Sequence, residues 1–308
     1  MFANIAGAAG RIRPSAIYSC VDQLRVWVRQ LTDKEHQWFD KHCDYFRPHP
    51  SPALFNYSLK VRMHLYGPDQ RALEELAGRS DVHFNYFEPG LDWVFRYDTS
   101  AEEARDTWHF HIVKPYHRGQ EMGFGESDGN YTWYTSRRRK VANNTAAYSD
   151  KRSRITGESN TCHIDYRITG AQALHRAKLG TIADVLNADP STFWADNRLL
   201  LCALDSSRFG RLFHNSLVGS KRRTPMIKRY NHGLIYDHDA RVGETIIRDC
   251  GCIQKVLDEF PYAHRCLVRM DIKHLLPPPG SAWTPYYDLC AHVCDPKSNP
   301  FKMKRYVV

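Results

Sequence analysis

The chain has 308 residues, of which 42% are hydrophobic and 25% are charged. This mixture is that of an ordinary globular protein, so it excludes a disordered chain and predicts a sizeable core. Lys and Arg number 43 against 34 Asp and Glu, a net charge of +9 that favours a polyanionic partner such as nucleic acid. A globular protein that is merely basic is the alternative.

The nine cysteines are odd in number and irregularly spaced, which is not typical of a disulfide framework. We therefore expect reduced thiols. No run of about 18 apolar residues occurs, so we expect no membrane-spanning helix. The short apolar stretch at the N-terminus has no basic region before it, unlike a signal peptide. Together these features predict a cytoplasmic protein without a membrane partner.

Strands dominate the first half of the chain. Alternating apolar residues, as at Val26 and Val28, are typical of half-buried strands. Thr32 and Glu35 form a capping-box pattern that predicts the start of a helix. The expected strands are 17–29, 55–66, 82–87, 91–97, 107–113, 131–136, 146–148 and 161–169, with 82–97 forming a hairpin around Glu88-Pro89-Gly90. The expected helices are 33–46 and 69–77, and 117–130 is expected to be a loop.

After Gly170 the sequence becomes rich in helical patterns. The order of elements predicts an α+β protein, in which an antiparallel sheet with helices packed on it precedes a helix-rich C-terminal extension. The expected divisions are a flexible leader (1–16), a sheet-based catalytic or nucleic-acid-binding domain (17–170), a helix-rich DNA-binding extension (171–276) and a Pro-rich basic tail (277–308).

The segment WHFHIV places His109 and His111 on one face of an expected strand, because side chains in a strand repeat every two residues. Two imidazoles on one face can bind a divalent metal. The alternative without a function is a pair of polar residues on a solvated face of the sheet.

The segment YTWYTSRRRK puts Tyr134 beside a run of cations, which are Arg137, Arg138, Arg139 and Lys140. Arginine clusters hold phosphates through charge-assisted contacts. A tyrosine hydroxyl next to a held phosphodiester can attack the phosphorus atom. A basic loop that only clamps a nucleic-acid backbone is the alternative.

Carboxylates follow in YSDKR, with Tyr148, Asp150 and Lys151, and in CHIDYRI. The second segment sets His163, Asp165 and Arg167 on one face of a strand. Asp150 and Asp165, joined by Asp22 of the first strand, could hold Mg²⁺ or Mn²⁺, which favour oxygen ligands. The alternative is a set of paired surface charges.

These segments resemble the Rep_trans group of plasmid and phage rolling-circle replication initiators. The resemblance covers about residues 20 to 170 and rests on VDQLRVWV, TWYTSRRR, AYSDK and HIDYRI. It implies a tyrosine that nicks one DNA strand and stays linked to the 5′ phosphate, assisted by a divalent metal. The family pattern is Tyr-x-Gly-Ser-Arg. Aligned without a gap on Ser136, this sequence has Trp133 in place of the tyrosine, and Tyr134 is one residue away.

The order HFH followed by Tyr148-x-x-Lys151 is similar to the HUH endonucleases. That resemblance implies that His109 and His111 bind the metal and that Tyr148 attacks DNA. Both resemblances imply the same strand-transfer reaction through different residues.

The C-terminal half carries a second basic segment, SKRRTPMIKRYNHG. Basic residues beside aromatic ones suit contacts with DNA and stacking on bases; a solvated basic loop is the alternative. The candidate contacts are Lys221, Arg222, Arg223, Lys228 and Arg229.

The first hypothesis is therefore a tyrosine-dependent DNA nickase and strand transferase that starts rolling-circle replication or mobilisation of a plasmid- or phage-type element. Tyr134 is the first choice of nucleophile and Tyr148 the second. Arg137 and Arg138 would hold the phosphate, and Lys151 would neutralise developing charge. The expected partner is single-stranded DNA or an origin duplex, and a homodimer is left open. The alternatives are a DNA-binding regulator without catalysis and an enzyme for a small anionic substrate.

Overall fold

The structure is a computed structural model, and it describes residues 12–50, 59–113, 123–127, 130–136, 142–196, 198–217 and 238–286. The candidate basic residues of both segments lie outside the described residues. They are Arg137, Arg138, Arg139, Lys140, Lys221, Arg222, Arg223, Lys228 and Arg229.

An eight-stranded antiparallel sheet forms the centre of the fold, in the order β2-β3-β1-β4-β8-β7-β6-β5. A small second sheet pairs β9 with β10. The strands are β1 (Ala16–Val28), β2 (Cys43–Pro50), β3 (Val61–Pro68), β4 (His83–Val94), β5 (Gly123–Ser127), β6 (Asn130–Tyr134), β7 (Asn143–Tyr148), β8 (Thr161–Thr169), β9 (Cys202–Leu204) and β10 (Leu267–Arg269).

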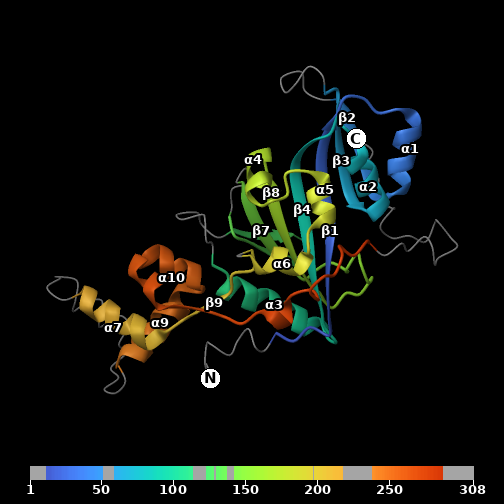
Figure 1. Cartoon of the computed structure of the whole chain (residues 1–308). Helices are drawn as coiled ribbons and strands as arrows, with labels where there is room; N and C mark the ends of the chain where they lie inside the picture. Colours follow the sequence, from blue (N-terminus) through green and yellow to red (C-terminus); the bar gives the residue numbers. More distant parts are fainter. Residues whose placement is uncertain are drawn as a thin grey trace.

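Helices alternate with strands early in the chain and dominate after β8, which confirms the predicted α+β class with a helix-rich C-terminal part (Figure 1). The α-helices are α1 (Asp33–Lys41), α2 (Gln70–Gly78), α3 (Asp98–His111), α4 (Ala171–Arg176), α5 (Ile182–Asn187), α6 (Pro190–Ala195), α7 (Ser206–Ser216), α9 (His238–Cys250) and α10 (Ile253–Glu259). Two 3₁₀ helices, η3 (Pro261–Cys266) and η4 (Lys273–Leu275), complete the set of described elements.

The main core lies on one face of the large sheet. Alternate side chains of the strands, such as Leu91 on β4 and Ile164 on β8, pack there against buried residues of α1 to α6. The side chains between them therefore point to the opposite face, because a strand alternates its two faces. That opposite face carries the candidate site.

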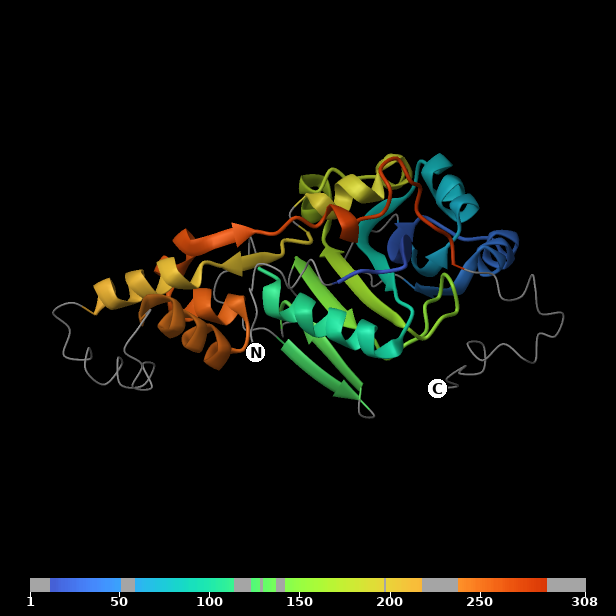
Figure 2. The same ribbon diagram turned by 90° about the horizontal axis from the view of Figure 1, so that it is seen from below.

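A second hydrophobic cluster lies beside the sheet, built by Phe209 and Phe213 of α7 with apolar residues of α9 and α10. Figures 1 and 2 both show these three helices grouped away from α1 and α2, at the other end of the molecule. Helices α4 to α6 instead pack into the core of the sheet. The boundary expected at residue 170 stays a prediction.

Four of the expected elements are corrected by the structure. The first helix ends at Lys41, and β2 begins at Cys43, inside the range expected to be helical. The expected loop 117–130 contains β5. The expected hairpin around Pro89 is one continuous strand, β4. Pro89 is tolerated there because it adjoins an irregularity in the pairing with β1, where a strand does not need every N–H.

Residues 107–111 of the segment TWHFHIV are not a strand but the end of helix α3, which is followed by Ile112 in an extended conformation. Ala101, Ala104 and Trp108 recur at helical spacing and are buried in the core. The strand prediction was wrong because it rested on a window too short to include this periodicity. Within the described ranges, no helix is long and apolar enough to cross a membrane.

Candidate active site

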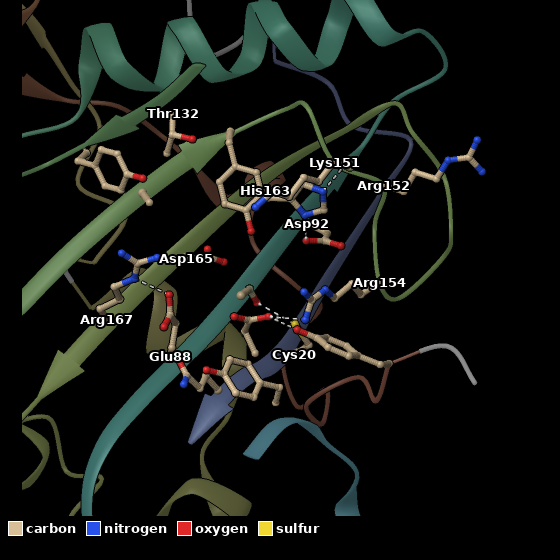
Figure 3. A pocket seen from close by; sticks show the side chains of 18 residues that line it. Cys20, Glu88, Asp92, Thr132, Lys151, Arg152, Arg154, His163, Asp165 and Arg167 are labelled. Carbon is tan, nitrogen blue, oxygen red and sulfur yellow. Dashed lines mark hydrogen bonds and ion pairs between the residues drawn. The ribbon is translucent and has the colours of Figure 1, made fainter. Parts of the chain in front are cut away.

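Three carboxylates from three neighbouring strands meet on the open face of the sheet. Asp22 of β1, Glu88 of β4 and Asp165 of β8 each offer an oxygen within 4.8 Å of the others. Figure 3 shows Glu88 and Asp165 on adjacent strands, with Arg167 on one side and His163 and Asp92 on the other. Hard divalent cations such as Mg²⁺ and Mn²⁺ take oxygen ligands of this kind, so the donor set fits such an ion.

The pairing of the strands explains why these side chains converge. Gln23 lies opposite Glu88, and Gly90 lies opposite Asp165. The register of β1 against β4 shifts between Val21 and Gln23, so the intervening residue, Asp22, sits in an irregularity of the ladder. Such irregularities redirect a side chain, which here brings Asp22 to the other two carboxylates.

Gly90 provides the space between the carboxylates. A Cβ atom at this position would lie 3.0 Å from Cys20 Sγ, 3.7 Å from Asp165 Oδ1 and 3.9 Å from Asp22 Cβ. The absent side chain therefore keeps the floor of the pocket open where the ligand oxygens meet.

Burial makes the carboxylates costly to ionise. Burial, with Asp22 and Glu88 close by, raises the pKa of Asp165 to about 8. Burial also raises the pKa of Glu88, although Arg167 opposes this by pairing with it. Clustered carboxyl groups whose pKa is raised in this way are typical of functional sites. A bound cation would relieve the repulsion between their charges.

Two other groups engage Asp22. The hydroxyl of Tyr286 donates a hydrogen bond to Asp22 Oδ1. Arg154 lies 3.8 Å from the same oxygen and 3.6 Å from Asp44 Oδ2. Tyr286 reaches the site because Thr284 N–H bonds to the carbonyl of Ser19 in β1, 2.6 Å away. Thr284 and Tyr286 thus both contact β1, and Tyr286 lines the pocket.

A buried ion pair stands beside the carboxylates. His163 Nδ1 donates to Asp92 Oδ1 and Nε2 donates to the carbonyl of Lys151, both at 2.8 Å. Burial alone lowers the pKa of His163, but Asp92 and the Lys151 carbonyl outweigh it and raise the pKa to about 9. Ser153 completes the arrangement by donating to Asp92 Oδ2 at 2.6 Å. His163 is therefore an imidazolium at neutral pH.

Both tyrosines proposed from the sequence line this pocket, Tyr134 from β6 and Tyr148 from β7. The ring of Tyr148 stacks on His163, and Lys151 Nζ lies 4.9 Å from the Tyr148 ring centroid. Burial, followed by Asp165, raises the pKa of Tyr148 well above its ordinary value. Its hydroxyl is therefore protonated at neutral pH.

Of the metal ligands and catalytic residues expected from the sequence, Asp22, Asp165, Tyr134, Tyr148 and Lys151 all line the pocket. Asp150 is exposed and is not among the lining residues. Arg137 and Arg138 lie outside the described residues.

The pairing of His109 with His111 is corrected. Residues two apart on a helix point about 200° apart around its axis, so the two imidazoles of α3 share no face. His111 Nδ1 bonds to the carbonyl of Cys202 at 2.8 Å, and His109 stacks on Trp133 with 3.5 Å between ring centroids. The argument for a metal site at this pair is therefore lost.

Trp133 occupies the opposite side of β6 from the pocket. It stacks on His109 of α3, and its indole N–H donates to Asp106 at 3.1 Å. The pocket position is taken by the neighbouring Tyr134. Trp133 and Tyr134 are separated in this way because adjacent strand residues face opposite sides.

Sequence reasoning missed Glu88, Asp92 and Gly90 as site residues. The sequence pattern predicts a turn at Glu88-Pro89-Gly90, and residues in a turn are not expected on a face of the sheet. Had β4 been treated as one strand, Glu88 would have faced the same side as Asp92 together with Gly90. Tyr286 carried no signal, because it lies far along the chain from the other site residues.

No protein-family model matches the chain, and no curated protein matches it. Among solved structures, a rolling-circle replication initiator protein from Geobacillus stearothermophilus is similar over 56% of this chain and 81% of that chain. The two share 12% sequence identity with a TM-score of 0.33.

Proposed function

We propose that the chain is a metal-dependent DNA nicking and strand-transfer protein of the replication-initiator kind. One observation carries the proposal: Asp22, Glu88 and Asp165 meet in a pocket that is also lined by Tyr134 and Tyr148. Carboxylates that suit a hard cation, next to a tyrosine hydroxyl, are the groups that phosphodiester transfer to a protein requires.

In this proposal Asp22, Glu88 and Asp165 hold Mg²⁺ or Mn²⁺. When bound, the ion would polarise the phosphodiester and stabilise charge on the leaving oxygen. Lys151 and Arg154 line the same pocket and can contact the non-bridging oxygens of the phosphate.

The reaction needs no outside energy source. The phenol oxygen of the nucleophile forms a bond to phosphorus, and the bond from phosphorus to the 3′ oxygen breaks. The phenol proton leaves to a carboxylate or to water, and the 3′ oxygen ends as a hydroxyl after taking up a proton. The 5′ phosphate stays on the tyrosine, so attack by another 3′ hydroxyl reverses the step and joins strands.

Tyr134 is the first choice of nucleophile, and Tyr148 is the second. The ring of Tyr148 contacts both His163 and Lys151, which favours a positioning role for it. Tyr134 lies on β6, one strand further from the carboxylates, and a Cβ atom at Gly125 of β5 would lie 3.1 Å from its ring.

The test uses labelled single-stranded oligonucleotides from the chain's own gene and flanking regions, incubated with Mn²⁺ or with EDTA and run on a denaturing gel. We expect a metal-dependent covalent adduct that is lost in Tyr134→Phe. Loss in Tyr148→Phe instead would make Tyr148 the nucleophile. Tyr131→Phe is the matched control, because Tyr131 lies on the same strand but is exposed and does not line the pocket.

A non-catalytic DNA-binding protein derived from an initiator is the second candidate. The observation that favours it is the hydrogen bond from Tyr286 to Asp22, which occupies one of the three carboxylates. Binding of DNA without any adduct, in Mn²⁺ and in Mg²⁺, would select this candidate and reject the nickase.

A further inference from the structure

The open face of the sheet continues beyond the carboxylate pocket as a surface of cations. We call Arg25 of β1, Arg62 and His64 of β3, and Arg47 and His49 of β2 the basic strip. Arg47 is exposed, and the other four side chains are half-buried. In each strand these residues alternate with core residues, so they share the face that carries the carboxylates.

The register of the strands places the members of the basic strip side by side. Arg25 and Arg47 lie opposite His64 from its two sides. Arg62 lies opposite His49 in the next row. Neighbouring strands are only about 4.8 Å apart, so these charges are crowded across β1, β3 and β2.

The cations of the basic strip have no acidic partners among the residues that the structure describes. Within the described part of the chain, Arg25, Arg47 and Arg62 form no ion pair. Arg62 Nε and His64 Nε2 are also buried and have no hydrogen-bond partner there. Unpaired cations held this close together cost stability, and an anionic ligand would offset that cost.

The pKa of His64 records this environment. Burial, followed by Arg25, Arg62, His49 and Arg47, lowers its pKa to about 4. The charged groups that lower this pKa, Arg25, Arg62, His49 and Arg47, are all cations of the basic strip.

The basic strip is continuous with the carboxylate pocket. The guanidinium of Arg25 lies 4.0 Å from the ring centroid of Tyr86, whose hydroxyl donates to Glu88. Tyr66 lines the pocket and is two residues from His64 on the same strand. Asp22 and Arg25 are three residues apart on β1, a distance of about 10 Å along a strand. One short strand of nucleic acid can therefore touch both.

An aromatic side chain stands at the edge of the same surface. Tyr45 of β2 is 50% exposed, and its ring centroid lies 5.5 Å from that of Tyr66. Exposed rings beside cations provide stacking platforms for the bases of single strands. Duplex grooves instead admit a helix or a two-stranded ribbon, and a broader sheet face does not enter them.

We propose that the basic strip binds the phosphates of single-stranded DNA next to the scissile position, with Tyr45 stacking on a base. The role of this single-stranded DNA as the substrate rests on the proposed function. The binding itself does not, because it needs neither a metal nor a nucleophile.

The test measures fluorescence anisotropy of a labelled single strand in EDTA, at several salt concentrations. The triple variant Arg25→Gln, Arg47→Gln, Arg62→Gln should bind about tenfold more weakly or worse. The plot of log affinity against log salt concentration should become shallower. The magnitude of its slope should decrease by about 2, at roughly 0.7 for each lost phosphate contact. Tyr45→Ala should weaken binding about fivefold or more, through loss of stacking.

The matched control is Arg71→Gln, Arg176→Gln, Arg265→Gln, which removes the same charge from exposed helical and 3₁₀ positions. It should bind within about twofold of the parent at the salt of the cell. If the first triple variant does not fold, Arg47→Gln alone tests the proposal, because Arg47 is exposed.

If the two triple variants lose the same affinity for single-stranded DNA, the effect comes from net charge in general, and the proposal is overturned. The proposal would also be overturned if the Arg25→Gln, Arg47→Gln, Arg62→Gln variant lost affinity for duplex DNA but bound single-stranded DNA as the parent does. The proposed nickase activity is tested separately. Asp165→Asn should abolish the covalent adduct but still bind single-stranded DNA in EDTA, so absence of the adduct does not contradict the proposed binding.

Discussion

Asp165 illustrates at the scale of a single residue how function and stability oppose each other. Its carboxyl is buried, with Asp22 and Glu88 close by, and its pKa is raised to about 8. A raised carboxyl pKa means that the folded state holds a proton that the unfolded chain releases near pH 4. The contribution of Asp165 to stability is thus favourable below about pH 4 and is lost as the pH rises to 8.

We expect Asp165→Asn to melt about 2 to 6 °C higher than the parent at pH 8 in EDTA, since it removes the repulsion. Mn²⁺ should raise the melting temperature of the parent and not that of the variant. Differential scanning fluorimetry at pH 5 and pH 8 checks both effects. A variant that is destabilised more at pH 8 than at pH 5 would show that the carboxylate is stabilising in the fold.

His163 has the opposite pH dependence. Asp92 and the Lys151 carbonyl outweigh burial and raise its pKa to about 9, above roughly 6.5 in an unfolded chain. The stability from this pair is therefore complete below pH 6.5 and is lost as the pH rises through 9. In EDTA, the melting temperature of the parent should exceed that of His163→Gln by an amount that shrinks from pH 6.5 to 9.5. His264→Gln, at an exposed position, should show no such trend.

At the scale of the elements, the site depends on how closely β1, β4 and β8 approach one another. Gly90 allows this approach, since a Cβ there would lie 3.0 Å from Cys20 Sγ. We expect Gly90→Ala to cost about 1–3 kcal/mol of unfolding free energy through crowding. It should also weaken Mn²⁺ binding about tenfold, because misplaced ligands lose affinity.

The control for this variant is Gly78→Ala at the end of α2, where a Cβ meets nothing within 4 Å. Calorimetric titration with Mn²⁺ measures the affinity of both variants. Parent-like Mn²⁺ binding by Gly90→Ala would mean that Asp22 and Asp165 do not share an ion across Gly90.

At the scale of the whole molecule, two hydrophobic clusters divide the described residues. Phe213 of α7 is fully enclosed in the second cluster, apart from the core of the sheet. We expect Phe213→Ala to cost about 3–5 kcal/mol locally. Amides of α7, α9 and α10 should then exchange hydrogen faster, whereas those of β1, β4 and β8 should not change.

Hydrogen exchange followed by mass spectrometry distinguishes the two behaviours. Faster exchange throughout the sheet would show that the molecule unfolds as one cooperative unit. That result would argue against the predicted separation of a helix-rich extension from the sheet-based domain, whose boundary at residue 170 is not yet tested.

The amino-acid sequence by itself determined the features that depend on local pattern. The alternation of His163, Asp165 and Arg167 against Ile164 and Tyr166 predicted the face of β8 correctly. The capping pair of Thr32 with Glu35 predicted the start of α1. These signals work because backbone periodicity and capping involve neighbours in the chain.

Only the tertiary structure decided which carboxylates meet. Glu88 joins Asp22 and Asp165 because β4 is inserted between β1 and β8, and strand order is not encoded in any local pattern. Burial by the whole core also decided that residues 107–111 are helical, which separated His109 from His111. Long-range packing sets both outcomes, since the free energy of burying a face depends on residues far away in the chain.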